Sequence, residues 1–208
     1  MLSDNGCSNE TGQFGMNWGA YNIENYNQWK EAGGWSISQG QNWANFSNVP
    51  FRLYKKYNHQ GGIATPLIAH WPGKINDVGG IDSRPGHVID LMATLVDVAG
   101  AEYPATFGGE TIKPMQGKSL IPWLEGKERK EHEYLYWEHE GNRAVRQGSW
   151  KLVAESEKEW ELYNLKDDPT ELNNLITEYP DRTKQLVKEY AEWAKKNDVR
   201  EFPYNDLK

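Results

Sequence analysis

The chain of 208 residues has one cysteine, no excess of basic residues and no long apolar run. Because Cys7 stands alone, no disulfide can form within the chain. Lys and Arg number 23 against 30 Asp and Glu, the net charge is −7, and no basic stripe occurs. This charge balance disfavours nucleic acid as a partner. A membrane-spanning helix needs about 20 apolar residues, so the sequence predicts no membrane segment. No signal-peptide pattern precedes Ser3.

The composition is that of a folded chain. Hydrophobic residues make up 38% and charged residues 25%, so a core can form and disorder is not expected. The length fits one domain or a large part of one. Ten Trp and eleven Tyr are many for this length. Such aromatic surface usually packs loops together, and it can also stack on sugar rings or aryl groups.

The first half of the chain mixes a long loop with two regular elements. Residues 5–50 show little periodicity and predict an ordered surface loop, with one short helical turn near residues 26–31. Residues 63–71 form a mostly apolar run before Pro72-Gly73, which indicates a buried strand and then a turn.

A helix is expected over residues 88–99, packed on a core. Its apolar side chains recur at helical spacing, and Gly100 follows at the position of a C-terminal cap. Pro104 prevents continuation. Residues 117–126 predict a further short helical turn.

The pattern changes after residue 132. Four short runs rich in strand-forming residues, separated by turn signals, predict an antiparallel meander: 133–139, 143–147, 150–154 and 160–164. Asp167-Asp168-Pro169 marks a closing turn. Residues 181–196 form an amphipathic helix, and the tail from Asp198 is polar. A helix on a small antiparallel sheet is an α+β layer arrangement.

Three residues of the N-terminal half suit chemistry on an anionic ester. Asp4 and Asn5 offer two adjacent oxygen ligands to a hard cation such as Ca²⁺ or Mg²⁺. Lys55 can place a cation near a tetrahedral anion. Each has a plainer reading: Asp-Asn-Gly is an ordinary turn sequence, and Lys55-Lys56 can be a solvated basic patch. His59, four residues after Lys55, is a second-rank candidate. The other histidines lack ligand spacing.

Taken in order, these segments resemble the C-terminal portion of a type I sulfatase of the arylsulfatase kind, in the alkaline phosphatase-like superfamily. The resemblance covers nearly the whole chain. Its segments are Ser3-Asp4-Asn5-Gly6, residues 43–62 with Lys55 and Gly61-Gly62, residues 65–72, residues 87–95, the four runs of the meander, and residues 168–175. It implies an α/β fold that ends in a small antiparallel sheet of about four strands packed with a C-terminal helix.

The resemblance also implies chemistry. Members hydrolyse sulfate esters through a formylglycine nucleophile, made from a Cys/Ser-x-Pro/Ala-x-Arg motif, with Ca²⁺ holding the nucleophile and the sulfate oxygens. By this resemblance Asp4 and Asn5 are metal ligands and Lys55 binds sulfate. The chain departs from the family, because it holds no such motif and has Gln60 where the family usually has Glu. We therefore expect a portion of a sulfatase that is inactive alone.

The resemblance divides the chain into two parts. Residues 1–131 correspond to the C-terminal part of the catalytic α/β domain, and residues 132–208 to a small α+β subdomain. The expected partner is a sulfated small molecule or glycan, with self-association through an exposed sheet face. A periplasmic or secreted location is expected for a full-length member. Two other readings stay open: a glycan-binding module built on the aromatic loop of residues 14–46, and a structural domain without a ligand.

Overall fold

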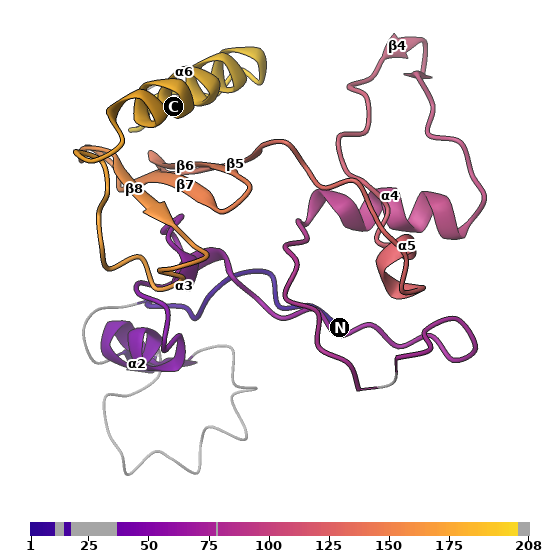
Figure 1. The fold of residues 1–208 in the computed structure, drawn as a ribbon, viewed down its shortest axis with the longest axis horizontal. Helices are drawn as coiled ribbons and strands as arrows, with labels where there is room; N and C mark the ends of the chain where they lie inside the picture. The colour runs from indigo at the N-terminus through magenta and orange to yellow at the C-terminus, as the bar shows by residue number, and fades with distance from the viewer. Residues whose placement is uncertain (11–14, 18–36, 78, 204–208) are drawn as a thin grey trace. The chain divides into compact units, whose positions relative to one another are not determined.

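The computed structural model describes residues 1–10, 15–17, 37–77 and 79–203. The chain divides into two compact units (Figure 1). Unit 1 consists of Met1 and Ile68–Glu133, and unit 2 of Leu2–Leu67 and Tyr134–Lys208. None of the helices in the described ranges is both long and apolar enough to cross a membrane.

The antiparallel meander predicted from the sequence is confirmed as a four-stranded sheet in unit 2. Its strands are β5 (Leu135–His139), β6 (Asn142–Gln147), β7 (Trp150–Ala154) and β8 (Glu161–Asn164), paired in that order. Two-residue turns join the first three strands. Glu140 and Gly141 both have positive φ, at 49° and 79°, as the tight hairpin turn that matches strand twist requires.

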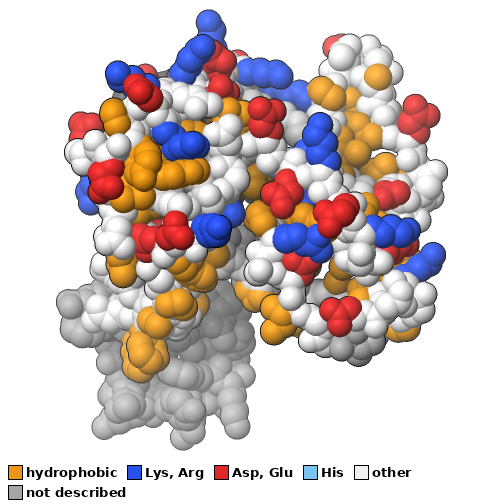
Figure 2. All heavy atoms as spheres, in the orientation of Figure 1, with side chains coloured by type: hydrophobic (Ala, Val, Ile, Leu, Met, Phe, Trp, Pro, Cys, Tyr) orange, Lys and Arg blue, Asp and Glu red, His pale blue; other side chains and the backbone are white. Residues whose placement is uncertain are grey.

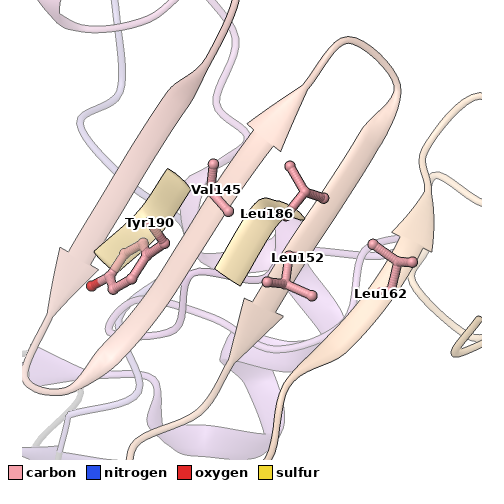
Figure 3. Close-up of a cluster of buried hydrophobic side chains, with 5 residues drawn as sticks. All are labelled: Val145, Leu152, Leu162, Leu186 and Tyr190. Atoms are coloured by element: carbon pink, nitrogen blue, oxygen red, sulfur yellow. The ribbon is translucent and has the colours of Figure 1, made fainter. Parts of the chain in front are cut away.

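The predicted C-terminal helix is also confirmed, as α6 (Pro180–Lys196). It covers one face of the sheet, and Figure 1 shows α6 on one side of the strands and α3 on the other. Side chains from three strands and the helix form the apolar core: Val145, Leu152, Leu162, Leu186 and Tyr190 (Figure 3). Because side chains alternate along a strand, the opposite face carries a second cluster of Ala144, Val153 and Tyr163. Both faces of the sheet are therefore buried.

The rest of unit 2 differs from the expected loop. Short strands β1 (Met16–Asn17) and β2 (Ile37–Ser38) pair, and helices α2 (Gly40–Ser47) and α3 (Gln60–Ile63) follow. The loop prediction is wrong over α2. Its sequence is rich in Asn and Gln, its N-cap makes no side-chain hydrogen bond, and only Gly40 and Ala44 are buried. The sequence therefore contains neither a capping signal nor an apolar stripe from which this helix could be predicted. The helical turn expected at residues 26–31 lies outside the described residues.

Unit 1 contains α4 (Ile89–Val98), the strand pair β3 (Thr106–Phe107) and β4 (Glu110–Thr111), and α5 (Ile121–Leu124). The helices expected at 88–99 and within 117–126 are confirmed, and Gly100 ends α4 with φ +59°. The expected packing of α4 on a core is wrong, because its apolar side chains are largely exposed: Val88 64%, Met92 54%, Leu95 63% and Val98 49%.

A buried polar cluster organises unit 1 instead. The carboxylate of Asp90, on α4, accepts hydrogen bonds from His132 (2.7 Å) and from the backbone amides of His87 (3.0 Å) and Lys118 (2.8 Å), and it forms an ion pair with Arg129 (2.8 Å). Burial alone would raise the pKa of Asp90, but these hydrogen bonds outweigh it and lower the pKa below its ordinary value. Asp90 thus ties residues 118–132 to α4.

The strand predicted at residues 63–71 is also wrong. Ile63 ends α3, Leu67 forms only an isolated bridge with Leu2, and Ile68 is 61% exposed. A buried parallel strand requires neighbours on both sides. In the described part of the chain, Leu67 and Ile68 pair with residues 1–2, and this pairing is too short to form a strand of a sheet.

We predict that Leu186→Ala lowers the free energy of unfolding of unit 2 by about 2–5 kcal/mol, because it removes a fully buried side chain from the core of Figure 3. Leu172→Ala is the control, since Leu172 is 71% exposed. Urea unfolding followed by circular dichroism measures both. Similar losses in the two variants would show that α6 does not pack as described.

Candidate functional site

Two segments that lie about 50 residues apart in the sequence meet side by side in unit 2. The Gly6 amide donates to the Gly62 carbonyl (2.9 Å), and the Lys55 amide donates to the Cys7 carbonyl (3.0 Å). A Cβ atom on Gly6 would lie 1.8 Å from the Gly61 carbonyl oxygen, so this approach requires glycine. The turn that carries Asp4 and Asn5 is thereby held against the segment that carries Lys55.

Asn48 adds a side-chain link between the same segments. Its Oδ1 accepts from the Cys7 amide (3.1 Å), and its Nδ2 donates to the Leu53 carbonyl (2.9 Å). The backbone on both sides of Lys55 is strained, because Leu53 and Lys56 have φ values of 67° and 92°. Non-glycine residues adopt such angles at a cost of about 1–3 kcal/mol and do so most often at functional sites.

The structure brings the candidate metal ligands near Lys55 but does not complete a metal site. Asp4 is exposed and Asn5 half-buried. Within the described ranges no three His, Cys, Asp or Glu side chains are placed to hold an ion. A carboxylate and an amide oxygen suit a hard cation, so the donor chemistry fits as part of a larger ligand set.

The Lys55 ammonium forms an ion pair at the surface. Its Nζ lies 3.1 Å from Glu10 Oε1, with side chains 36% and 59% exposed. This hydrogen bond, with that from Ser8, lowers the pKa of Glu10. Exposed pairs of this kind are weak, so a stronger anion can displace Glu10. Lys56 pairs elsewhere, with Glu140 at 3.2 Å.

His59 is fully buried and bonded to the C-terminal sheet. Its Nε2 lies 2.9 Å from Glu161 Oε2 on β8, and Nδ1 has no hydrogen-bond partner. Glu161 also accepts from the Tyr163 hydroxyl (2.9 Å). The hydrogen bond with His59 is the main cause that lowers the pKa of Glu161, and the hydrogen bond from Tyr163 adds to it, although burial acts in the opposite direction. The pKa of Tyr163 is raised, mainly by burial and then by its hydrogen bond to Glu161.

Sequence reasoning missed a second set of polar residues beside His59. Lys151 and Glu171 form a fully buried ion pair of 2.7 Å, and Arg52 donates to the Tyr163 hydroxyl (3.1 Å) and the Glu171 carbonyl (3.0 Å). One signal was available: alternation along β7 places Lys151 on the same face as the buried Val153. Nothing in the run around Glu171 indicates burial.

Comparison with known proteins gives a consistent picture. Residues 51–198 match the family model "N-sulphoglucosamine sulphohydrolase, C-terminal". An uncharacterized sulfatase of Schizosaccharomyces pombe is 31% identical over 193 residues, 88% of this chain and 33% of that protein. An N-acetylglucosamine-6-O-sulfatase of Bacteroides thetaiotaomicron is 31% identical over 163 residues, 71% of this chain and 28% of that protein. The chain spans about a third of the length of these relatives.

Solved structures show the same fold. The crystal structure of Ps i-CgsB in complex with k-i-k-neocarrahexaose superposes with a TM-score of 0.61 at 22% identity, over 74% of this chain and 34% of that chain. A putative sulfatase from Bacteroides thetaiotaomicron gives 0.52 at 26% identity, over 77% and 36%. The expected fold, an α/β sulfatase portion ending in a four-stranded antiparallel sheet and a helix, is thereby confirmed.

We predict that Gly6→Ala separates the Asp4-Asn5 turn from the Lys55 segment, because the new methyl group would overlap the Gly61 carbonyl. The residue 6 amide should lose its protection from hydrogen exchange, and stability should fall by about 1–3 kcal/mol. Gly86→Ala is the control, since its Cβ would meet only Leu120 Cδ2, at 3.7 Å. Unchanged exchange at residue 6 would refute the close approach.

Proposed function

Because the chain belongs to the family of the C-terminal portion of N-sulphoglucosamine sulphohydrolase, within the type I sulfatases, we propose that it supplies part of the active site of a sulfate ester hydrolase. The observation that carries the proposal is the meeting of the Asp4-Asn5 turn with the Lys55 segment. In this proposal residues 1–131 belong to the catalytic α/β domain, and residues 132–208 form a small α+β subdomain.

Lys55 is the sulfate-binding residue in this proposal. Its ammonium is held by an exposed carboxylate, which a doubly charged sulfate can replace. Asp4 and Asn5 would hold Ca²⁺ or Mg²⁺ together with ligands from outside this chain. The bound cation supplies positive charge to the sulfate oxygens. For His59 the geometry favours holding the segment rather than touching the ester, because its Nε2 is bonded to Glu161 inside unit 2.

The nucleophile comes from outside these 208 residues in this proposal. The sequence contains no Cys/Ser-x-Pro/Ala-x-Arg motif, and Cys7-Ser8-Asn9-Glu10-Thr11 does not fit it. Covalent hydrolysis of a sulfate ester requires such a group. The chain alone should therefore turn over no sulfate ester.

A sulfated glycan is the substrate class that we propose. One relative is an N-acetylglucosamine-6-O-sulfatase, and one structural neighbour was crystallised with a neocarrahexaose. Both names concern carbohydrate. The exposed aromatic side chains of α2 would suit a sugar ring, because aromatic faces contact the apolar faces of sugars.

We predict that Lys55→Ala lowers kcat of the complete enzyme more than it raises KM, because the ammonium meets charge that grows on the ester oxygen. The loss should be on the order of 3 kcal/mol, about a hundredfold in rate. The assay uses this chain joined to the remaining two thirds of a related sulfatase, with an aryl sulfate as substrate. Lys56→Ala is the matched control. Equally small effects of Lys55→Ala and Lys56→Ala would show that Lys55 is not a sulfate-binding residue.

One observation favours a second candidate function, glycan binding without hydrolysis. On α2, Trp43 and Phe46 are 60% and 68% exposed and meet edge to face at 5.7 Å, a surface open to a sugar ring. Calorimetric titration with sulfated and unsulfated oligosaccharides tests it. Binding that is lost in Trp43→Ala and kept in Lys55→Ala would support this function over the first.

We also propose that the chain associates with itself through the exposed side chains of unit 1. Val88, Met92, Leu95 and Val98 present apolar surface on and beside α4, and Figure 2 shows hydrophobic side chains at the surface among the elements of this unit. Soluble monomers rarely expose large apolar patches.

We predict that light scattering shows a mass that rises with protein concentration. Leu95→Glu, which places a charge on this surface, should return the chain to a monomer, whereas Lys188→Glu on α6 should not. A wild-type monomer at high concentration that binds no hydrophobic dye would count against the proposal.

A further inference from the structure

Two carboxylates bond to residues 52–60 beside the C-terminal sheet: Glu161, which bonds to His59, and Glu171, which bonds to Gln60. Glu171 follows β8, and its Oε1 accepts from Lys151 Nζ of β7 at 2.7 Å. Both side chains are fully buried. Burial disfavours the charged form of Lys151 and lowers its pKa, and the charge of Glu171 opposes this. A pair so buried is costly unless further hydrogen bonds satisfy it.

The further hydrogen bonds all run to the segment that carries Lys55. Glu171 Oε2 accepts from the backbone amide of Gln60 at 2.7 Å. Lys151 Nζ also donates to Gln60 Oε1 at 3.1 Å. The carbonyl of Glu171 accepts from Arg52 Nη1 at 3.0 Å. A single residue therefore holds residue 52 and residue 60 at once.

The backbone of Glu171 has a left-handed conformation. Its φ is +58°, in the left-handed region that a residue with a Cβ rarely adopts. The Gln60 amide is the first free donor of α3, and His59, at the N-cap, provides no side-chain acceptor. Glu171, which lies 111 positions later in the sequence, supplies that acceptor.

Lys55 lies between the two anchored ends. Residues 53 and 56, on either side of it, are strained, and strain persists only where the surroundings fix it. We propose that Glu171, paired with Lys151, is a positioning residue that fixes residues 52–60 and thereby sets where the Lys55 ammonium lies. Its relevance to sulfate rests on the proposed function.

Two double variants separate the acceptor from the ion pair. Lys151→Met with Glu171→Gln removes both charges but keeps a side-chain oxygen for the Gln60 amide. Lys151→Met with Glu171→Leu removes that oxygen too. In the Leu variant we expect the Gln60 amide to exchange with solvent at least about tenfold faster than in the Gln variant, while the Leu186 amide stays protected in both.

Carbon-13 NMR of the lysine Cε atoms reads the position of Lys55 directly. Without sulfate, the Lys55 signal reports its pairing with Glu10; it should shift in the Leu variant and stay in place in the Gln variant, with Lys56 as internal control. Equal exchange rates of the Gln60 amide in the two variants overturn the proposal. A Lys55 signal with the same chemical shift in the Leu variant as in the wild type also overturns it.

A variant at the other anchor keeps the proposal testable if the Leu variant does not fold. Arg52, whose side chain is 32% exposed, is changed to Met, which removes the donor to the Glu171 carbonyl and also the donor to the Tyr163 hydroxyl. The Lys55 signal should again shift, and an unchanged signal overturns the proposal. Titration of the wild type with inorganic sulfate tests the proposed function separately. A Lys55 signal that sulfate does not move would refute sulfate binding and leave the positioning role standing.

Discussion

The buried ion pair of Lys151 and Glu171 is the constraint on which the candidate site depends. Exchanging such a pair for apolar side chains is often neutral or stabilising, so its presence is not explained by stability. The pair instead fixes the position of Gln60 on the sheet, because each partner of the pair also bonds to Gln60. An apolar pair would fill the same space and leave the Gln60 amide without an acceptor. The polar pair specifies which part of residues 52–60 lies over the sheet.

Close backbone packing completes what the ion pair begins. Cβ atoms on Gly61 and Gly62 would lie 2.3 Å from the Arg52 carbonyl and 1.9 Å from the Tyr57 carbonyl. These glycines let residues 52–62 fold back on themselves, and Gly6 packs against Gly61 and Gly62. The Asp4-Asn5 turn is therefore positioned by contacts with a segment that the C-terminal sheet has already fixed. A substitution at Lys151 in β7, or at Glu171 after β8, should therefore alter the position of Lys55 through these contacts.

Sequence patterns predicted the four-stranded sheet and α6, whose packing is completed within unit 2. The runs of β5 to β8 alternate, their turns carry Gly141 and Gly148 at positive φ, and α6 has one apolar stripe that meets them. The approach of residues 4–6 to residues 55–62 depends instead on backbone hydrogen bonds, which leave no mark beyond the glycines. The spacing of His59 from Lys55 makes it a candidate, and spacing alone does not indicate that its ring is bonded to Glu161.

The errors over residues 63–71 and over the packing of α4 share one physical origin, since an apolar pattern reports what a residue would bury and not what is present to bury it. Residues 63–71 and α4 both have the composition of buried elements, and both leave large apolar side chains exposed in the described chain. Unit 1 is held together by the Asp90 carboxylate, its three hydrogen-bond donors and its ion pair with Arg129. Unit 2 buries both faces of its sheet. The apolar pattern of residues 63–71 and α4 therefore does not reveal whether the described residues cover these segments.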